Sequence, residues 1–94
     1  MSKFQDVPVE DDTKIKLNLE TTFGDYDVLY QKWYWDGIYA DSLIFIANDV
    51  EGLDDDALKA YVSESELVTD KDAGMTIKRD SKGYTFVNFN FVYE

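Results

Sequence analysis

The feature that most constrains the fold is the dipeptide Asp36-Gly37, which separates two runs rich in aromatic and β-branched residues between positions 26 and 47. An Asp-Gly pair in this setting predicts a β-hairpin with a two-residue type I′ turn. The turn fixes the cross-strand pairs, which are Trp35 with Ile38, Trp33 with Ala40, Leu29 with Ile44, Val28 with Phe45, and Lys32 with Asp41. The last pair joins opposite charges and stabilises the hairpin.

Both faces of the predicted hairpin are apolar, because its side chains alternate between two sides. One face carries Leu29, Trp33, Trp35, Ile38, Ala40, Ile44 and Ile46. The other face carries Val28, Tyr30, Tyr34, Tyr39, Leu43 and Phe45. Both faces of such a hairpin need to be packed against other segments, and the rest of the chain contains few apolar segments that could do so.

Three further segments have the pattern of strands. Residues 13–23 alternate, and we expect the apolar set to face inward: Ile15, Leu17, Leu19, Thr21 and Phe23. Residues 75–79 and 84–93 flank a four-residue loop and predict a second hairpin with two-sided alternation along its long strand. Because this last strand is longer than its partner, we expect its second half to pair elsewhere, with the first strand as the candidate.

One helix is predicted after the acidic segment that follows the central hairpin. Asp54 suits the N-cap, and Leu53 and Leu58 have the spacing of a hydrophobic staple. Residues 63–69 are compatible with either a short strand or a loop. The element order β-β-β-α-(β)-β-β indicates an α+β fold, an antiparallel sheet of about five strands with one short helix packed on one face.

The predicted organisation is a flexible acidic N-terminal arm, residues 1–12, followed by one domain, residues 13–94. The arm contains Pro8 and four carboxylates, and its apolar residues do not recur with the spacing of a helix or a strand. Phe4, Val7 and Val9 are its candidates for contact with the domain.

Composition excludes several kinds of site. The 94 residues include neither cysteine nor histidine, which excludes disulfides, thiol nucleophiles and zinc sites built from these residues. The five glycines are separate turn residues rather than a phosphate-binding loop. We therefore expect no enzyme activity, no cofactor and no metal site. The longest aliphatic and aromatic run, residues 43–47, is too short to span a bilayer, so the expected location is the cytoplasm, that of the host if the gene belongs to a phage.

Charge is the strongest functional signal, because twenty acidic residues against nine basic residues give a net charge of −11. A field of this sign repels nucleic acid and anionic membranes and attracts basic surfaces. Solubility alone is the simpler explanation. The carboxylates that we select as a partner-binding site are Asp25, Asp27, Asp49, Glu51, Asp54, Asp55 and Asp56.

The tip of the central hairpin adds aromatic candidates to the same predicted site. These residues are Tyr34, Trp35, Asp36 and Tyr39. Exposed aromatic side chains beside carboxylates suit an arginine-rich partner surface. They suit a homodimer seam equally well.

We interpret the sequence as a small, non-enzymatic inhibitor that imitates DNA or RNA and occupies the basic nucleic-acid-binding surface of a partner enzyme. Anti-restriction and anti-CRISPR proteins of phages and mobile elements act in this manner, and the analogy rests on charge and size alone. The alternative is an immunity-type or structural module that homodimerises, or joins an assembly, through an exposed hairpin face. A binder of a small ligand between helix and sheet is a third interpretation.

Overall fold

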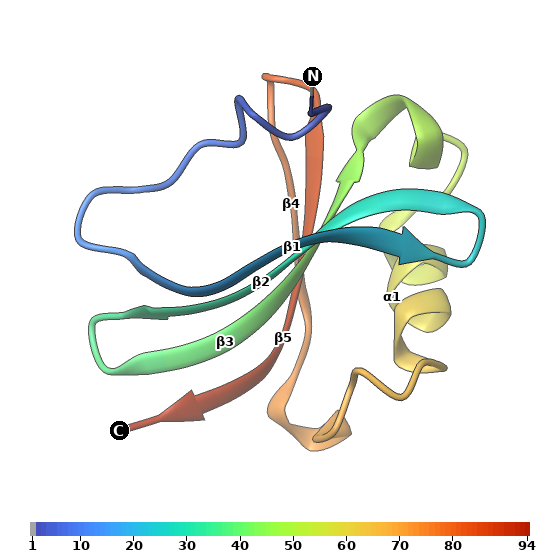
Figure 1. Ribbon diagram of the computed structural model, residues 1–94. Helices are drawn as coiled ribbons and strands as arrows, with labels where there is room; N and C mark the ends of the chain where they lie inside the picture. Colours follow the sequence, from blue (N-terminus) through green and yellow to red (C-terminus); the bar gives the residue numbers. More distant parts are fainter. Residues whose placement is uncertain (1) are drawn as a thin grey trace.

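A computed structural model describes residues 2–94, and Met1 of the predicted arm lies outside the described residues. Five antiparallel strands form one sheet in the order β1-β2-β3-β5-β4 (Figure 1). The strands are β1 (Lys14–Phe23), β2 (Tyr26–Trp35), β3 (Ile38–Ile46), β4 (Thr76–Arg79) and β5 (Tyr84–Tyr93). The helices are the 3-10 turns η1 (Ala47–Val50) and η2 (Lys71–Ala73) and the α-helix α1 (Asp55–Ser63). The α+β fold expected from the sequence is confirmed, and residues 64–70 form no strand.

The central hairpin has the register that its turn predicts. All five expected cross-strand pairs of β2 and β3 are present. Asp36 and Gly37 have φ angles of 48° and 81°, the positive values that a type I′ turn requires at both central positions. Lys32 Nζ lies 3.2 Å from each carboxylate oxygen of Asp41. Local turn chemistry therefore fixed the pairing of the two longest apolar segments.

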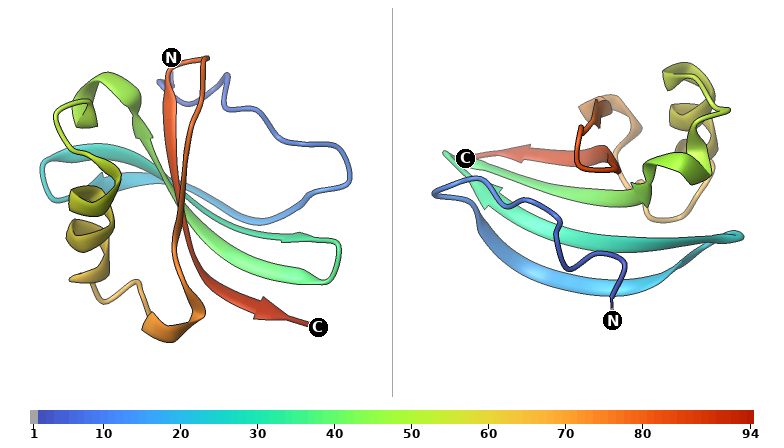
Figure 2. Two further views of the ribbon diagram at one scale, coloured as in Figure 1. Left: turned by 180° about the vertical axis from the view of Figure 1, so that it is seen from behind. Right: turned by 90° about the horizontal axis from the view of Figure 1, so that it is seen from above.

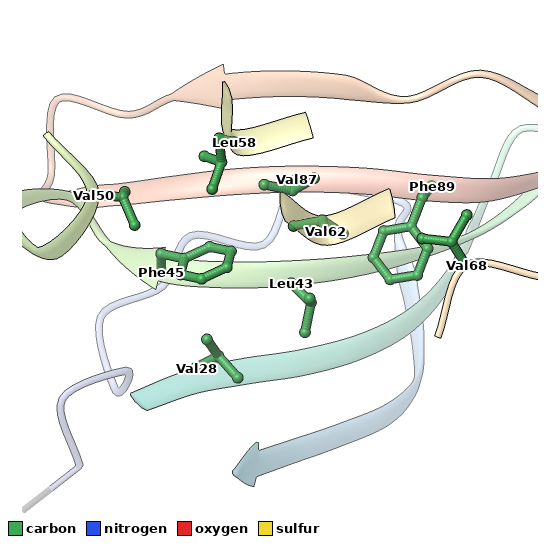
Figure 3. Packing of buried hydrophobic residues seen from close by; sticks show 9 residues of the cluster. All are labelled: Val28, Leu43, Phe45, Val50, Leu58, Val62, Val68, Val87 and Phe89. Atoms are coloured by element: carbon green, nitrogen blue, oxygen red, sulfur yellow. The ribbon is translucent and has the colours of Figure 1, made fainter. Parts of the chain in front are cut away.

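The main core lies between α1 and one face of the sheet, which we call the helix face. Asp54 caps the helix by accepting a 2.8 Å hydrogen bond from the Ala57 amide. Leu58 and Val62 of α1 are fully buried against side chains of β2, β3 and β5 (Figure 3). The buried members of this cluster are Val28, Leu43, Phe45, Val50, Leu58, Val62, Val68, Val87 and Phe89. Each fully buried aliphatic or aromatic side chain stabilises the fold by about 1.5–3 kcal/mol relative to exposure.

The N-terminal arm supplies the cover that the opposite, second face of the sheet needs. Phe4 is buried there and stacks on Tyr84 with the ring centroids 6.3 Å apart. The Tyr84 hydroxyl donates to the Lys3 carbonyl at 3.0 Å, and Leu29 and Ile44 complete this smaller cluster. The arm and α1 lie on opposite sides of the strands (Figures 1 and 2).

The first strand differs from the expectation for its inward face. Leu17 and Leu19 retain 37% and 49% of their accessible surface. The nine-residue α1 reaches Phe23, whose ring lies 5.2 Å from that of Tyr61, and ends before it can cover the two leucines. The helix-face side of β1 is therefore only half-covered. The bulge between Ile15 and Leu17 also separates Ile15 from the predicted inward set, because it places Ile15 opposite Trp33 on the second face.

The last strand also corrects two expectations. It pairs with β3 along both its halves and never with β1. The register shifts between Tyr39 and Asp41, where β5 accommodates an extra residue and Asn90 adopts a φ of 55°. This bulge reverses the alternation, so Val92 lies opposite Tyr39 and Tyr93 lies opposite Ile38.

Candidate functional site

The seven predicted carboxylates gather at one end of the sheet, which we call the acidic end. Asp25 lies in the turn between β1 and β2, and Asp27 lies at the start of β2. Asp49 lies in η1, Glu51 follows it, Asp54 is the N-cap of α1, and Asp55 and Asp56 are its first residues. These segments lie on the same side of the molecule in Figure 1. The turn is held against the helix because Gly24 contacts the Tyr61 hydroxyl, where a Cβ would collide. All seven carboxylates are exposed.

Two cations reach into the acidic end. Lys3 Nζ pairs with Asp27 at 2.7 Å, and Arg79 Nε pairs with Asp55 at 3.1 Å. The hydrogen bond and the charge of Asp27 raise the pKa of Lys3, and the charge of Asp49 contributes in the same direction. Asp49 therefore lies within electrostatic reach of this pair. Within residues 2–94, the other five carboxylates of the acidic end form no ion pair.

An open hollow of about 760 Å³ lies between η1, the start of α1 and β4. Its walls include Glu51, the three aspartates of the helix start, and Arg79. Thr85 is among the residues that line the hollow, and its buried hydroxyl makes no hydrogen bond with the described part of the chain. Across positions 2 to 94, no three acidic side chains are arranged to hold a metal ion. The hollow instead offers carboxylate oxygens to donors from outside.

The aromatic candidates lie at the other end of the sheet, which we call the aromatic tip: Tyr34, Trp35, Asp36 and Tyr39. The two ends are separated by the length of β2, since seven residue steps from Asp27 to Tyr34 span about 23 Å. The two turns emerge on opposite sides of the molecule in Figure 1. The structure therefore does not bring the predicted site together as one surface.

Within the aromatic tip, Tyr34 and Tyr39 are in contact, with ring centroids 4.6 Å apart. The Tyr34 hydroxyl donates to Glu94 at 3.1 Å, and this bond raises the pKa of Tyr34. Trp35 and Tyr39 expose 41% and 42% of their surface, and neighbouring Val92 and Tyr93 expose 60% and 69%. Aromatic and aliphatic side chains therefore dominate the exposed surface near the tip, unlike that of the acidic end.

A row of polar side chains on the second face was not identified in the sequence. Five residues lie side by side across all five strands, in the order Asn18, Gln31, Ser42, Asn88 and Thr76. Gln31 donates to Asn18 at 3.0 Å, Ser42 to Asn88 at 2.5 Å, and Asn88 to Thr76 at 3.2 Å. Of these neighbouring pairs, only Gln31 and Ser42 can be predicted from the register of the central hairpin, because the other pairs depend on the order of all five strands.

This row borders a groove of about 450 Å³ between the sheet and the arm. Both tryptophans of the chain line it, and the Trp33 indole donates to Ser42 at 2.7 Å. Lys78 and Lys82 balance Glu10 and Asp80 on its walls. The groove is thus locally neutral in a protein of strong negative charge.

The sequence predicts the pairing of Asp41 with Lys32 but not the burial and further contacts of this carboxylate, which lies beside the bulge on the helix face. It accepts hydrogen bonds from Lys32, from Tyr30 at 3.2 Å and from Asn90 at 2.9 Å. Burial lowers the pKa of Lys32, but the bonds to Tyr30 and Asp41 and the charge of Asp41 outweigh it and raise that pKa overall. Burial is the main cause of the raised pKa of Tyr30. These groups satisfy one another and form a structural network.

Comparison with protein families, curated proteins and solved structures finds no match to this chain. Across the 93 described positions, 2–94, no helix has both the length and the apolar character to cross a membrane.

Proposed function

We propose that the protein is a non-enzymatic inhibitor that places its acidic end on the basic, nucleic-acid-binding surface of a partner enzyme. The observation that carries the proposal is the convergence of seven exposed carboxylates from three chain segments on one end of the sheet. Asp54 caps the helix and the helix dipole favours Asp55 and Asp56 in its first turn. Arg79 and Lys3 neutralise only Asp55 and Asp27, so Asp25, Asp49 and Glu51 have neither a role at the start of α1 nor an ion pair within residues 2–94. The surplus charge is consistent with a surface that competes with phosphates.

The frame that carries these charges supports the same proposal. The β1–β2 turn packs on α1 through Gly24 and Tyr61, and Phe23 and Tyr26 contact the same Tyr61 ring. Carboxylates held on a packed frame lose little conformational entropy on binding. The targets that best fit such a surface are DNA- or RNA-binding enzymes, including the restriction and CRISPR nucleases that phage proteins inhibit.

The decisive experiment compares two charge-reversal variants with the same total charge. The first changes Asp49, Glu51 and Asp56 to lysine, which avoids the helix cap and the two ion pairs. The matched control changes Asp6, Asp11 and Asp12 of the arm to lysine. Each variant is immobilised and exposed to lysate at low and moderate ionic strength, and captured proteins are eluted with duplex DNA.

We expect the first variant to lose capture of nucleic-acid-binding proteins and the arm variant to retain it. Capture by the unmodified protein should weaken steeply as salt rises, because exposed charges are screened beyond about 8–10 Å at physiological ionic strength. Equal loss in both variants would show that only net charge matters. Undiminished capture by the first variant would remove the acidic end from the mechanism.

The second candidate function is self-association or assembly through the aromatic tip. Its support is the exposure of Trp35, Tyr39, Val92 and Tyr93 at one end of the sheet. Association through this tip would be nearly independent of salt, which separates it from the first proposal.

A further inference from the structure

The two edges of the sheet differ in their protection against pairing with another strand. The edge strand β4 has four residues, and short edge strands are a common protection. The edge strand β1 has ten residues, and two exposed leucines lie along its helix-face side. A long edge with apolar side chains presents unpaired backbone groups to a further strand.

We propose that β1 pairs antiparallel with β1 of a second copy of this chain, forming a two-fold dimer with one continuous sheet. This inference goes beyond the proposed function and does not depend on it, because β1 contributes no residue to the acidic end. The leucines would face each other across the seam, where α1 does not reach.

The charges along β1 favour a second copy as the occupant. Lys14 and Lys16 lie at the start of the strand, and Glu20, which accepts a hydrogen bond from the Ser2 hydroxyl of its own chain, lies near its end. An antiparallel arrangement brings the lysines at the start of one strand towards Glu20 of the other strand, twice per dimer. Neither lysine forms an ion pair within residues 2–94 of its own chain.

The same charges select the register. Pairing centred on Asn18 places Leu17 opposite Leu19 of the second copy and Lys16 opposite Glu20. Pairing centred on Glu20 would instead place two glutamates directly opposite each other, which is unfavourable. The bulge between Ile15 and Leu17 leaves Lys16 without a partner on β2, so it is available at the edge.

The first test measures the oligomeric state by sedimentation over a range of protein concentrations. We expect a monomer–dimer equilibrium that the exposed substitution Leu19→Lys weakens about tenfold or more, because the contact occurs twice. Val92→Lys is the matched control, since Val92 on β5 is also an exposed aliphatic residue, at 60% against 49% for Leu19, and it should leave the dimer intact. A monomer at every concentration, or a dimer disrupted by Val92→Lys but not by Leu19→Lys, would overturn the proposal.

The second test exchanges the charges of Lys16 and Glu20, which lie opposite each other across the seam only in the register centred on Asn18. Lys16→Glu should weaken the dimer, and the double variant Lys16→Glu/Glu20→Lys should restore it to within about threefold of the original. Lys71→Glu makes the same change of net charge away from β1 and should have no such effect. Hydrogen exchange should show protection of β1 amides that increases with protein concentration, while β4 amides are unchanged. Failure of the double variant to recover, with exchange at β1 independent of concentration, would refute the seam even if another dimer formed.

Discussion

The guanidinium of Arg79, at the end of β4, lies 3.1 Å from the carboxylate of Asp55 in the first turn of α1. Its second nitrogen donates to the Leu53 carbonyl at 2.9 Å. One side chain therefore connects the edge of the sheet to the start of the helix. It also reduces the negative charge at the acidic end, which is the surface proposed to bind a partner.

Replacement of Arg79 by glutamine should strengthen binding to a basic probe. The change removes a positive charge from the acidic end, so affinity for polylysine measured at low salt should increase. The ion pair is exposed, so the free energy of unfolding should fall by only about 1 kcal/mol or less. Lys71→Gln makes the same charge change beyond the other end of α1, and its smaller effect on affinity provides the control. An equal gain in both variants would contradict a localised acidic end.

The central hairpin could be predicted completely from the sequence because its determinants are local. Asp36 and Gly37 select the turn, and the turn fixes every pair along two strands. The N-cap at Asp54 could be predicted for the same reason. Features that depend on a third segment could not be derived in this manner.

The bulge in β5 is such a feature. Asn90 occupies a left-handed conformation, donates to Asp41 and to the Leu67 carbonyl, and accepts from the Thr69 amide at 2.8 Å. Its partners belong to β3 and to the segment after α1, which are remote in the sequence. Alternation within residues 84–93 therefore predicted a regular strand where tertiary contacts favour a bulge.

Substitutions of Asn90 should separate its backbone role from its hydrogen bonds. Asn90→Gly retains easy access to positive φ but loses the amide, and should lower the free energy of unfolding by about 1–3 kcal/mol. Asn90→Ala loses the side-chain amide and also the easy access to positive φ. It should lower the free energy of unfolding by about 1 kcal/mol more than Asn90→Gly, because a left-handed residue with a Cβ is strained. Urea denaturation measures both values. Equal stability of the glycine variant and the original protein would show that the hydrogen bonds of the Asn90 side chain do not stabilise the fold.

The separation of the candidate site into two ends has a simpler cause. Successive turns of an antiparallel meander lie at opposite ends of the shared strand, so Asp25 and Asp36 cannot be neighbours when β2 has ten residues. The sequence contained this information, but grouping residues by chemistry alone placed them in one site. The exposure of Leu17 and Leu19, in contrast, depends on how far α1 extends over the sheet.

Alkaline pH should destabilise the protein. The pKa values of Lys3, Lys32, Tyr30 and Tyr34 are all raised in the folded state, by the partners described above and, for Tyr30, mainly by burial. In the unfolded chain, tyrosine and lysine have pKa values of about 10 and 10.4. The folded state retains these protons more strongly, so their stabilisation is complete below about pH 10 and is lost as the pH rises through the folded values.

Thermal unfolding followed by circular dichroism between neutral and strongly alkaline pH tests this expectation. The melting temperature should fall above about pH 10, and the double variant Tyr30→Phe/Tyr34→Phe should show a shallower fall because two of the shifted groups are absent. The comparison uses the slope with pH rather than the absolute melting temperature, since loss of the hydroxyls also removes hydrogen bonds to Asp41 and Glu94. An unchanged slope in the double variant would contradict a contribution from these tyrosines.

Finally, the acidic end and the aromatic tip should act independently. They are about 23 Å apart along β2, and effects of substitutions separated by more than about 7–10 Å usually add to within about 0.5 kcal/mol. Trp35→Ala and Asp56→Lys should therefore have additive effects on affinity for polylysine, with nearly all of the loss coming from Asp56→Lys. Because Trp35 is exposed and distant from α1, its removal leaves the field at the acidic end unchanged. A coupling energy well above that limit, measured by titration of both single variants and the double variant, would show that one bound chain contacts both ends and that the two surfaces form a single site.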